Sequence, residues 1–328
     1  MPDLHVRYLG LHLKNPLIVA SSGLTKSLGK IKACEDAGAG AVVVKSLFEE
    51  VLAKDAEAWT GTADAHTEAY DYLRAEANMQ YGPEEYALLI NKAKEATDFP
   101  IIASLNCVTP KWWPEFALKV ENAGADAIEL NIFPLISDVT KDSSALEQDY
   151  YDILKAVKEV VNIPVAMKIG RNITALPAFA ARLTGYGLNA LVLFNRFVET
   201  EIDIETLQLK TTFPFSHSDD IYETLRWIAI LRDNTVCELS ATTGIHTYEA
   251  LVQLLLAGAN TVQLASVLYK KGFRKIKELL QDLGEWMEIQ NFETIDDFRG
   301  MLSFKKTMKM NADMYLRTQF LEKTREVE

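Results

Sequence analysis

Cysteine is scarce in this chain. Its 328 residues contain three cysteines, Cys34, Cys107 and Cys237, which lie far apart and form no CxxC pair. This number and spacing argue against a disulfide framework and a cysteine zinc site, and they indicate a reducing compartment. The five histidines also lack the spacing of metal ligands, so we expect no metal.

Long apolar segments are missing as well. No uncharged apolar run reaches the roughly 18 residues that a membrane-spanning helix needs. The first segment, MPDLHVRYLGLHLKNP, has no apolar stretch of the length found in signal peptides. We therefore expect a cytoplasmic protein without a membrane partner.

Positive charge is in deficit, and several common motifs are absent. The net charge of −12 argues against a nucleic-acid partner, although a few backbone amides and one or two cations suffice for a small phosphate pocket. There is no GxSxG sequence and no P-loop. AGAGA (37–41) precedes an apolar run, whereas a dinucleotide-binding glycine loop follows a strand.

What the chain does contain is a series of apolar runs that each end on a polar or basic residue. Runs rich in Val, Ile and Leu, without alternation, are typical of strands buried on both faces. In a parallel α/β barrel, the carboxyl ends of the strands hold the active site. The six runs are AVVVKS (41–46), ASLN (103–106), AIELN (127–131), PVAMK (164–168), ALVLFN (190–195) and VQLAS (262–266).

Glycine turns, prolines and helical patterns separate the strands. Apolar residues at intervals of three and four predict helices over 83–96, 114–123, 145–160, 222–232 and 247–257. Eight strands alternating with helices predict a (β/α)₈ TIM barrel in a single domain, residues 1–328, with an open doubly wound sheet as the alternative. The long connections after strands two and six, about 47–82 and 196–219, are predicted to be lids or binding loops.

Basic and amide side chains at the strand ends predict a binding site. Lys45 and Ser46 end strand two, and Lys168 ends strand five. Each lysine alone has an alternative role as the first solvated residue after a strand, but two on one rim would converge on an anion or an electron-rich cofactor atom. Glu129 is a weaker candidate, an interior residue held by a lysine. Amides suit the edges of a heterocycle, and the strand-end asparagines are Asn106, Asn131 and Asn195.

The last quarter of the chain predicts a phosphate cradle. SATTGIHT (240–247) follows strand seven, and LAS (264–266) ends strand eight. The loops after these two strands bind phosphate in many barrels, through backbone amides and a short helix N-terminus. A plain helix N-cap is the alternative. The residues that fit the cradle are Thr242, Thr243, Gly244 and Ser266.

Taken together, these segments resemble the dihydroorotate dehydrogenase family, in the cytosolic class that lacks a membrane-targeting helix. The likeness covers most of the chain, and it is specific only as a set. The segments that carry it, in the family's order, are LKNPLIVASSG, VVVKS, IELN, VAMKIG, LVLFN, TTGIHTYEALVQLLLAGANTVQLASVLY and FETIDDFRG.

The resemblance implies a (β/α)₈ barrel that binds FMN and oxidises dihydroorotate to orotate, with hydride passing to flavin N5, in pyrimidine biosynthesis. It implies that Lys45 contacts flavin and substrate, that Lys168 contacts the flavin, and that Asn131 and Asn195 hydrogen-bond flavin or substrate. Ser46 and Asn106 end strands on the same rim, so we also expect them to contact the cofactor. The remaining implied contacts are Ala20, Ser21 and Gly23 near the ring, and Thr243, Gly244, Ala265 and Ser266 at the phosphate.

The departures from the family concern the substrate. The family's fourth strand continues into an Asn–Leu–Ser–Cys–Pro–Asn-like motif, whose cysteine (serine in the membrane-bound class) removes the substrate's C5 proton. Here the segment is NIFPLISD (131–138), without that cysteine or the second asparagine. General-base assistance is worth about 10²–10⁴-fold, and Ser137 is the candidate replacement if the loop is shifted. The double glycine after strand seven is Thr243–Gly244, and TTFPFSHSDD (211–220) replaces the glycine-rich stretch after strand six.

We therefore expect an FMN-dependent CH–CH dehydrogenase that acts on a small-molecule substrate. A family paralogue with another substrate and a flavin-binding barrel without turnover are the alternatives, with a phosphate-sugar isomerase or aldolase using Lys168 as a fourth. The chain has no iron–sulfur cysteine set, so the electron acceptor stays unknown and any such cluster would belong to a partner. Similar proteins lead us to expect a homodimer.

Overall fold

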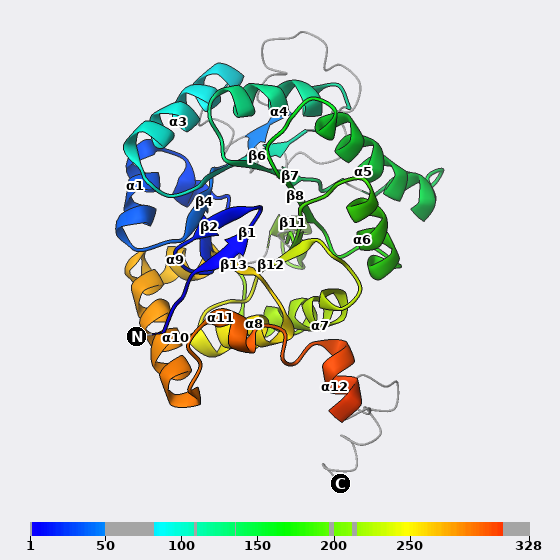
Figure 1. The fold of residues 1–328 in the computed structure, drawn as a ribbon. Coiled ribbons are helices and arrows are strands. Elements are labelled where there is room, and N and C mark those ends of the chain that lie inside the picture. The colour runs from blue at the N-terminus through cyan, green and yellow to red at the C-terminus, as the bar shows by residue number, and fades with distance from the viewer. Residues whose placement is uncertain are drawn as a thin grey trace.

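The structure is a computed structural model that describes residues 2–49, 82–107, 110–134, 136–196, 200–211 and 215–310. Its centre is a closed barrel of parallel strands, which confirms the predicted (β/α)₈ TIM barrel over the open sheet (Figure 1). The barrel strands are buried along nearly their whole length, as the apolar runs indicate. The eight barrel strands are β3 (Leu17–Val19), β4 (Ala41–Val43), β6 (Ile101–Asn106), β7 (Ala127–Asn131), β8 (Val165–Ile169), β9 (Ala190–Leu193), β12 (Glu238–Thr242) and β13 (Thr261–Leu264).

The hydrogen-bonded ladder runs around the barrel and returns to its start. Each strand pairs with the next in chain order, and β13 pairs with β3 through the register Val262 to Leu17. The register also sets Asn131 on β7 beside Lys168 on β8. Because all strands are parallel, their carboxyl ends meet at one end of the barrel, where the polar strand-end residues gather. A short strand, β5 (Leu47–Phe48), extends the sheet beside β6.

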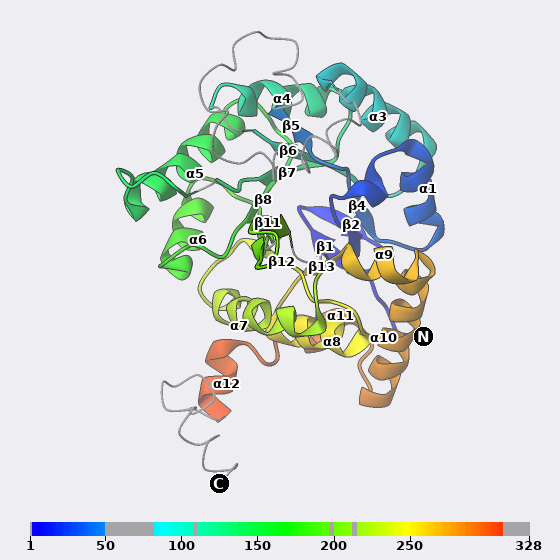
Figure 2. The same ribbon diagram turned by 180° about the vertical axis from the view of Figure 1, so that it is seen from behind.

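Helices surround the barrel and cover its outer face (Figures 1 and 2). α3 has the predicted bounds, with Pro83 in the first turn and acidic residues after it, where the helix dipole favours them. α4 begins two residues before the predicted start, with Pro114 still in its first turn. The helices are α1 (Leu28–Asp36), α3 (Pro83–Ala96), α4 (Trp112–Asn122), α5 (Ser143–Lys158), α6 (Leu176–Gly185), α7 (Ile221–Arg232), α8 (Tyr248–Ala257), α9 (Ser266–Lys271), α10 (Arg274–Gln290), α11 (Ile295–Phe298) and α12 (Phe304–Met310), with 3₁₀ turns η1 (Gly23–Thr25) and η3 (Ser218–Asp220).

An N-terminal hairpin that the sequence did not predict lies across the amino end of the barrel. Its strands are β1 (Val6–Tyr8) and β2 (Leu11–Leu13), and in Figure 1 they lie in front of the barrel. Tyr8 is fully buried, and the backbone amide of Leu9 donates to the Glu238 carboxylate at the start of β12. A bridge between Asp3 and Thr294 joins this segment to α11. The hairpin and α11 therefore close the end of the barrel opposite the predicted site.

The connection after β9 is not a plain loop. It contains an antiparallel hairpin, β10 (Thr200–Asp203) and β11 (Gln208–Thr211), which lies at the carboxyl end of the barrel (Figure 2). One face of the hairpin carries exposed apolar side chains, and the other carries Glu201, Asp203 and Lys210 in an ion-pair cluster. The sequence predicted a lid or binding loop over 196–219 but did not predict a hairpin within it. Most of the other predicted loop, 47–82, lies outside the described residues.

Candidate active site

A cavity of about 130 Å³ opens at the carboxyl ends of β3, β8, β9, β12 and β13. Nine residues that the sequence singled out line it, including both parts of the predicted cradle. They are Ala20, Ser21, Lys168, Asn195, Thr242, Thr243, Gly244, Ala265 and Ser266. Because these residues come from five strand ends far apart in the sequence, the closed barrel is what brings them together.

The loop after β12 is shaped for a group that approaches its backbone closely. Thr243 and Gly244 both have positive φ, 78° and 82°. A Cβ on Gly244 would lie 2.4 Å from the Ile221 backbone nitrogen, so only glycine fits. Thr243 is held by donating its hydroxyl to the Phe194 carbonyl over 3.1 Å. Tight turns of the backbone can form anion-binding concavities, and the prediction of a phosphate cradle concerns this turn.

Ser266 completes the cradle from the other side. It is the first residue of α9, and its Oγ accepts a bond from the Ser216 amide over 3.0 Å. Lys270 donates to the Ser216 carbonyl over 2.9 Å, and the Ser216 hydroxyl lies 3.2 Å from His246 Nε2. Burial and the nearby Lys270 charge lower the pKa of His246. The long connection after β9 is thus fastened to the cradle at Ser216.

Two hydrogen-bond chains extend the site along the barrel rim. Ser21 Oγ lies 3.0 Å from Ser46 Oγ, which lies 2.8 Å from Ser104 Oγ on β6. Across the site, Asn195 donates to the Asn131 side-chain oxygen over 2.6 Å. Ser46 and Asn131 do not line the cavity themselves, but each is bonded to a residue that does.

The remaining predicted residues lie farther out. Gly23 begins η1, Asn106 ends β6, and Lys45 lies in the connection between β4 and β5 rather than at the end of its strand, but none of the three lines the cavity. A Cβ on Gly23 would meet the Tyr269 hydroxyl at 2.7 Å. Ser137 is exposed and also absent from the cavity lining. The structure therefore assembles the cradle and leaves Ser137 outside it.

Phe133 occupies the chain just beyond the end of β7. A Cβ on Gly170, which follows β8, would lie 2.4 Å from the Phe133 ring. The ring is therefore packed against the end of β8, two residues beyond Lys168. Phe133 thus lies in the segment that carries the catalytic-cysteine motif in the dihydroorotate dehydrogenase family. A phenylalanine ring cannot act as a general base, because it neither accepts nor donates a proton.

Sequence reasoning missed several cavity residues. Arg196 and Ser216 come from the connection after β9, where no repeated pattern marked individual positions. Arg196 Nε lies 3.8 Å from an Asp220 carboxylate oxygen. Gln263 lies inside β13 and read as part of an apolar run. Its side chain is directed into the barrel, where it donates to Glu129 over 2.7 Å.

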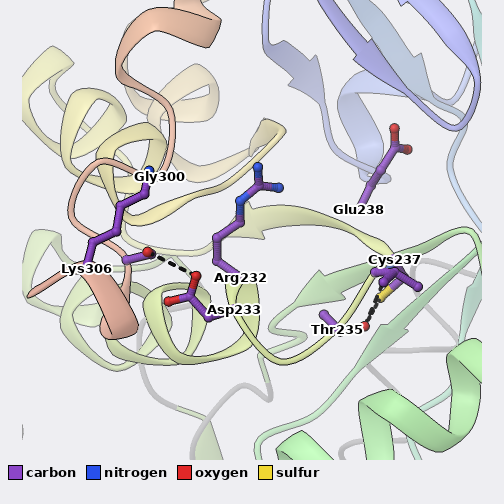
Figure 3. Close-up of a pocket in the computed structure, with 9 residues that line it drawn as sticks. Arg232, Asp233, Thr235, Cys237, Glu238, Gly300 and Lys306 are labelled. Atoms are coloured by element: carbon purple, nitrogen blue, oxygen red, sulfur yellow. Dashed lines mark hydrogen bonds between the residues drawn. The ribbon is translucent and has the colours of Figure 1, made fainter. Parts of the chain in front are cut away.

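A second, larger cavity of about 470 Å³ lies at the other end of β12 (Figure 3). Its polar groups are engaged in local structure: Asp233 accepts from Ser303 and from the Lys305 amide, and Thr235 lies 3.1 Å from the Cys237 sulfur. In barrels of this kind the amino end serves stability rather than chemistry. We therefore assign the chemistry to the smaller cavity.

Two features typical of other functions are missing from the residues that the structure describes. No group of three or more His, Cys, Asp or Glu side chains in that part of the chain is arranged to hold a metal ion. No helix within the same ranges is both long and apolar enough to span a membrane.

The fold is a (β/α)₈ barrel, and the predicted site residues at the carboxyl ends of five strands line one cavity. A family model described as dihydroorotate dehydrogenase matches residues 72–287, and the chain belongs to the dihydroorotate dehydrogenase family. It is a flavin-dependent dehydrogenase.

Curated relatives match along nearly the whole chain. The catalytic subunit of dihydroorotate dehydrogenase B (NAD(+)) from Pyrococcus abyssi is 26% identical over 304 residues, which cover 91% of this chain and 98% of the relative. The same subunit from Thermoplasma volcanium is 28% identical, with 92% and 99% covered. The chloroplastic dihydropyrimidine dehydrogenase (NADP(+)) of Arabidopsis thaliana is 26% identical, with 91% and 76% covered.

Proposed function

We propose that the chain binds FMN in the cavity at the carboxyl end of the barrel and oxidises a CH–CH bond of a small substrate, with dihydroorotate as the first candidate. The observation that carries this proposal is the cradle of Thr243, Gly244 and Ser266. A phosphate fits there because the backbone approaches closely at Gly244, where a Cβ would collide with Ile221.

The chemistry of the side chains and their places in the cavity are both compatible with FMN. The cradle would hold the phosphate, Lys168 and Gln263 would face the ribityl chain or ring, and Ala20 and Ser21 would border the ring. The cavity's 130 Å³ is smaller than the roughly 300–1,000 Å³ of ligand sites. The cavity therefore accommodates only part of FMN, and the rest of the cofactor would extend beyond it.

The protein's own part in the reaction would be binding, orientation and charge. When bound, FMN supplies the hydride acceptor, which amino-acid side chains do not provide. Asn131 and Asn195 form one amide pair that can orient a heterocycle edge, and Lys45 lies two residues beyond the carboxyl end of β4. Positive charge from Lys45 would stabilise negative charge that develops on the substrate.

The first experiment is to test for flavin and its reduction. Purified protein should be yellow, and anaerobic dihydroorotate should bleach the flavin absorbance. Protein that is colourless and cannot be reconstituted with FMN would overturn the proposal. Bleaching by dithionite but not by dihydroorotate would keep the cofactor and reject this substrate.

One observation favours a second candidate, a family paralogue with a different substrate. The family's cysteine position is occupied by Pro134, which has no proton-accepting side chain, its neighbour Phe133 packs against Gly170, and Ser137 is exposed. A substrate that needs no side-chain base at this position would suit such a site better. Because one relative is a dihydropyrimidine dehydrogenase, the bleaching test should include dihydrouracil and dihydrothymine beside dihydroorotate.

We propose that electrons leave through a separate partner. The chain has neither a dinucleotide-binding glycine fingerprint nor a cysteine set for an iron–sulfur cluster, whereas its relatives are named as NAD(+)- or NADP(+)-linked enzymes. The reduced protein alone should therefore not be reoxidised by NAD(+). Rapid reoxidation by NAD(+) without any added subunit would contradict this.

We also propose a homodimer formed through the β10–β11 hairpin. Ile202 pairs with Leu209 on one face and both are more than half exposed, with Ile204 and Leu207 beside them at the turn. Two-stranded hairpins are marginally stable alone, so this apolar face needs a cover. Light scattering should give twice the chain mass, and the pair Ile202→Asp and Leu209→Asp should give a monomer. A wild-type monomer would refute the dimer.

A further inference from the structure

A fully buried carboxylate lies directly behind the lysine of the cavity. Glu129 is the central residue of β7 and is 1% exposed. Gln263, on β13 at the opposite side of the barrel, donates its Nε2 to Glu129 Oε2 over 2.7 Å. Lys168, on the adjacent strand β8, lines the cavity together with Gln263. The hydrogen bond from the Gln263 side-chain amide to Glu129 thus crosses the barrel beneath the proposed flavin site.

The hydrogen bonding of this pair is incomplete. Glu129 Oε1 and Gln263 Oε1 are both buried without a hydrogen-bond partner. A buried acceptor without a partner destabilises a fold, and well-packed apolar residues are often at least as stable as buried charges. Stability therefore does not explain a carboxylate at this position. Buried charged groups next to a cavity are instead typical of functional sites.

Several groups face Glu129, but only one of them brings a positive charge. Burial raises the Glu129 pKa, and the Lys168 charge lowers it again. The other titratable groups that interact with Glu129 are Tyr8, from β1, and Tyr86, from α3. Burial raises the pKa of both phenols, so they are neutral at physiological pH. Among the described residues, Lys168 is thus the counter-charge of Glu129.

We propose that Glu129 is a positioning residue for the cofactor: its carboxylate balances the charge of Lys168 and limits the positive potential that this lysine presents to the flavin ring. Gln263 holds the carboxylate in place from across the barrel. The inference rests on the proposed function, because it needs a flavin in the cavity above Lys168. Its consequence is that a residue without flavin contact tunes how readily the ring accepts negative charge.

Sulfite is a suitable probe of this potential. It adds through its sulfur to N5 of an oxidised flavin, bleaches the absorbance, and leaves negative charge on the ring. The experiment compares sulfite Kd for FMN-loaded wild type and Glu129→Gln, a nearly isosteric change. We expect the variant to bind sulfite about tenfold more tightly, since one charge within about 10 Å acts with that strength at an effective dielectric of about 20. The Kd for FMN should change less than about threefold.

Two further variants separate charge from packing. Lys168→Met should weaken sulfite binding. The double variant Lys168→Met/Glu129→Gln should have the same sulfite Kd as Lys168→Met, because the Glu129 carboxyl without its lysine is already uncharged. Gln263→Met should shift sulfite binding in the same direction as Glu129→Gln, since the carboxylate loses its hydrogen bond. It also serves as the test if Glu129→Gln does not fold.

The outcomes are distinct. Equal sulfite affinities in wild type and the two variants Glu129→Gln and Gln263→Met, with FMN bound in each, would overturn the role of Glu129 and leave the proposed function intact. A protein that cannot be loaded with FMN would overturn both.

Discussion

The two halves of the barrel mouth differ in how completely they are built. The cradle half, made of Thr243, Gly244, Ala265 and Ser266, lines a formed cavity. The substrate half, made of the segments that follow β7 and β9, carries Phe133 against Gly170 and an exposed Ser137. Under the proposed function, the difference means that the cofactor half of the mouth is the more completely formed and the substrate half is where the chain departs from the family motif.

The largest expected effect tests the substrate half. Lys45→Ala should abolish measurable flavin reduction by the true substrate, a loss of at least about 10²–10³-fold, because a positioned charge is removed from the reacting end. FMN should remain bound, since Lys45 does not line the cavity. Anaerobic stopped-flow absorbance measures the rate, and Lys14→Ala, an exposed lysine beyond β2, is the control. An unchanged rate would remove Lys45 from the site.

The next effect tests the cradle half. Gly244→Ala should weaken FMN binding about 10–100-fold, because the new Cβ meets the Ile221 nitrogen and the φ of 82° is strained for alanine. Gly272→Ala is a matched control, with a φ of 77° but no atom within 4 Å of the new Cβ. Titration of the apoprotein, followed by quenching of FMN fluorescence, gives both Kd values. Equal losses in the two variants would point to backbone strain alone.

A smaller effect asks whether the two halves are independent. Asn131→Ala removes the acceptor of the 2.6 Å bond from Asn195. We expect KM for the substrate to rise about 3–10-fold, the worth of one hydrogen bond, with the FMN Kd within about threefold. Steady-state kinetics and FMN titration measure the two. A larger change in FMN affinity than in KM would place Asn131 in the cradle half instead.

The smallest effect concerns the stability of the protein, which Glu129 affects from inside the barrel, beneath both halves of the mouth. Burial raises the Glu129 pKa above its ordinary value of 4.5, so the folded protein holds this proton more tightly than the unfolded chain. The resulting stabilisation is complete below pH 4.5 and is lost as the pH rises through the raised pKa. The Tm of Glu129→Gln minus the Tm of wild type should therefore increase as the pH rises from 4 to 8, which thermal melts at a series of pH values measure. Glu95→Gln, at an exposed site on α3, should show no such trend.

Local patterns were sufficient to predict the barrel strands and most helices. Continuous apolar runs and the proline at 83 act within one element, so a single sequence displays them. The N-terminal hairpin escaped prediction because its turn places Leu9, a buried residue, at a φ of 55°. That position usually carries Gly, Asn or Asp, so only Gly10, the second turn residue, followed the usual pattern.

The site was predictable to the extent that strand ends define it. Lys168, Asn195 and the cradle each stand at the end of an apolar run, so the fold itself carries them to one cavity. The bond from Gln263 to Glu129 spans 134 positions and leaves no local trace. Arg196 and Ser216 come from a connection whose path depends on tertiary contacts, such as the bond between Ser216 and Ser266.

The ladder between β3 and β13 has a consequence for how the protein is made. Leu17 is paired with Val262, so the first barrel strand waits for a partner synthesised roughly 240 residues later. At about 5–20 residues per second, that edge stays open on the ribosome for roughly 12–50 s. An unpaired parallel edge is a template for wrong pairing during this time. Shielding of the nascent N-terminal third should therefore raise the yield of closed barrels more than any late-acting aid to folding.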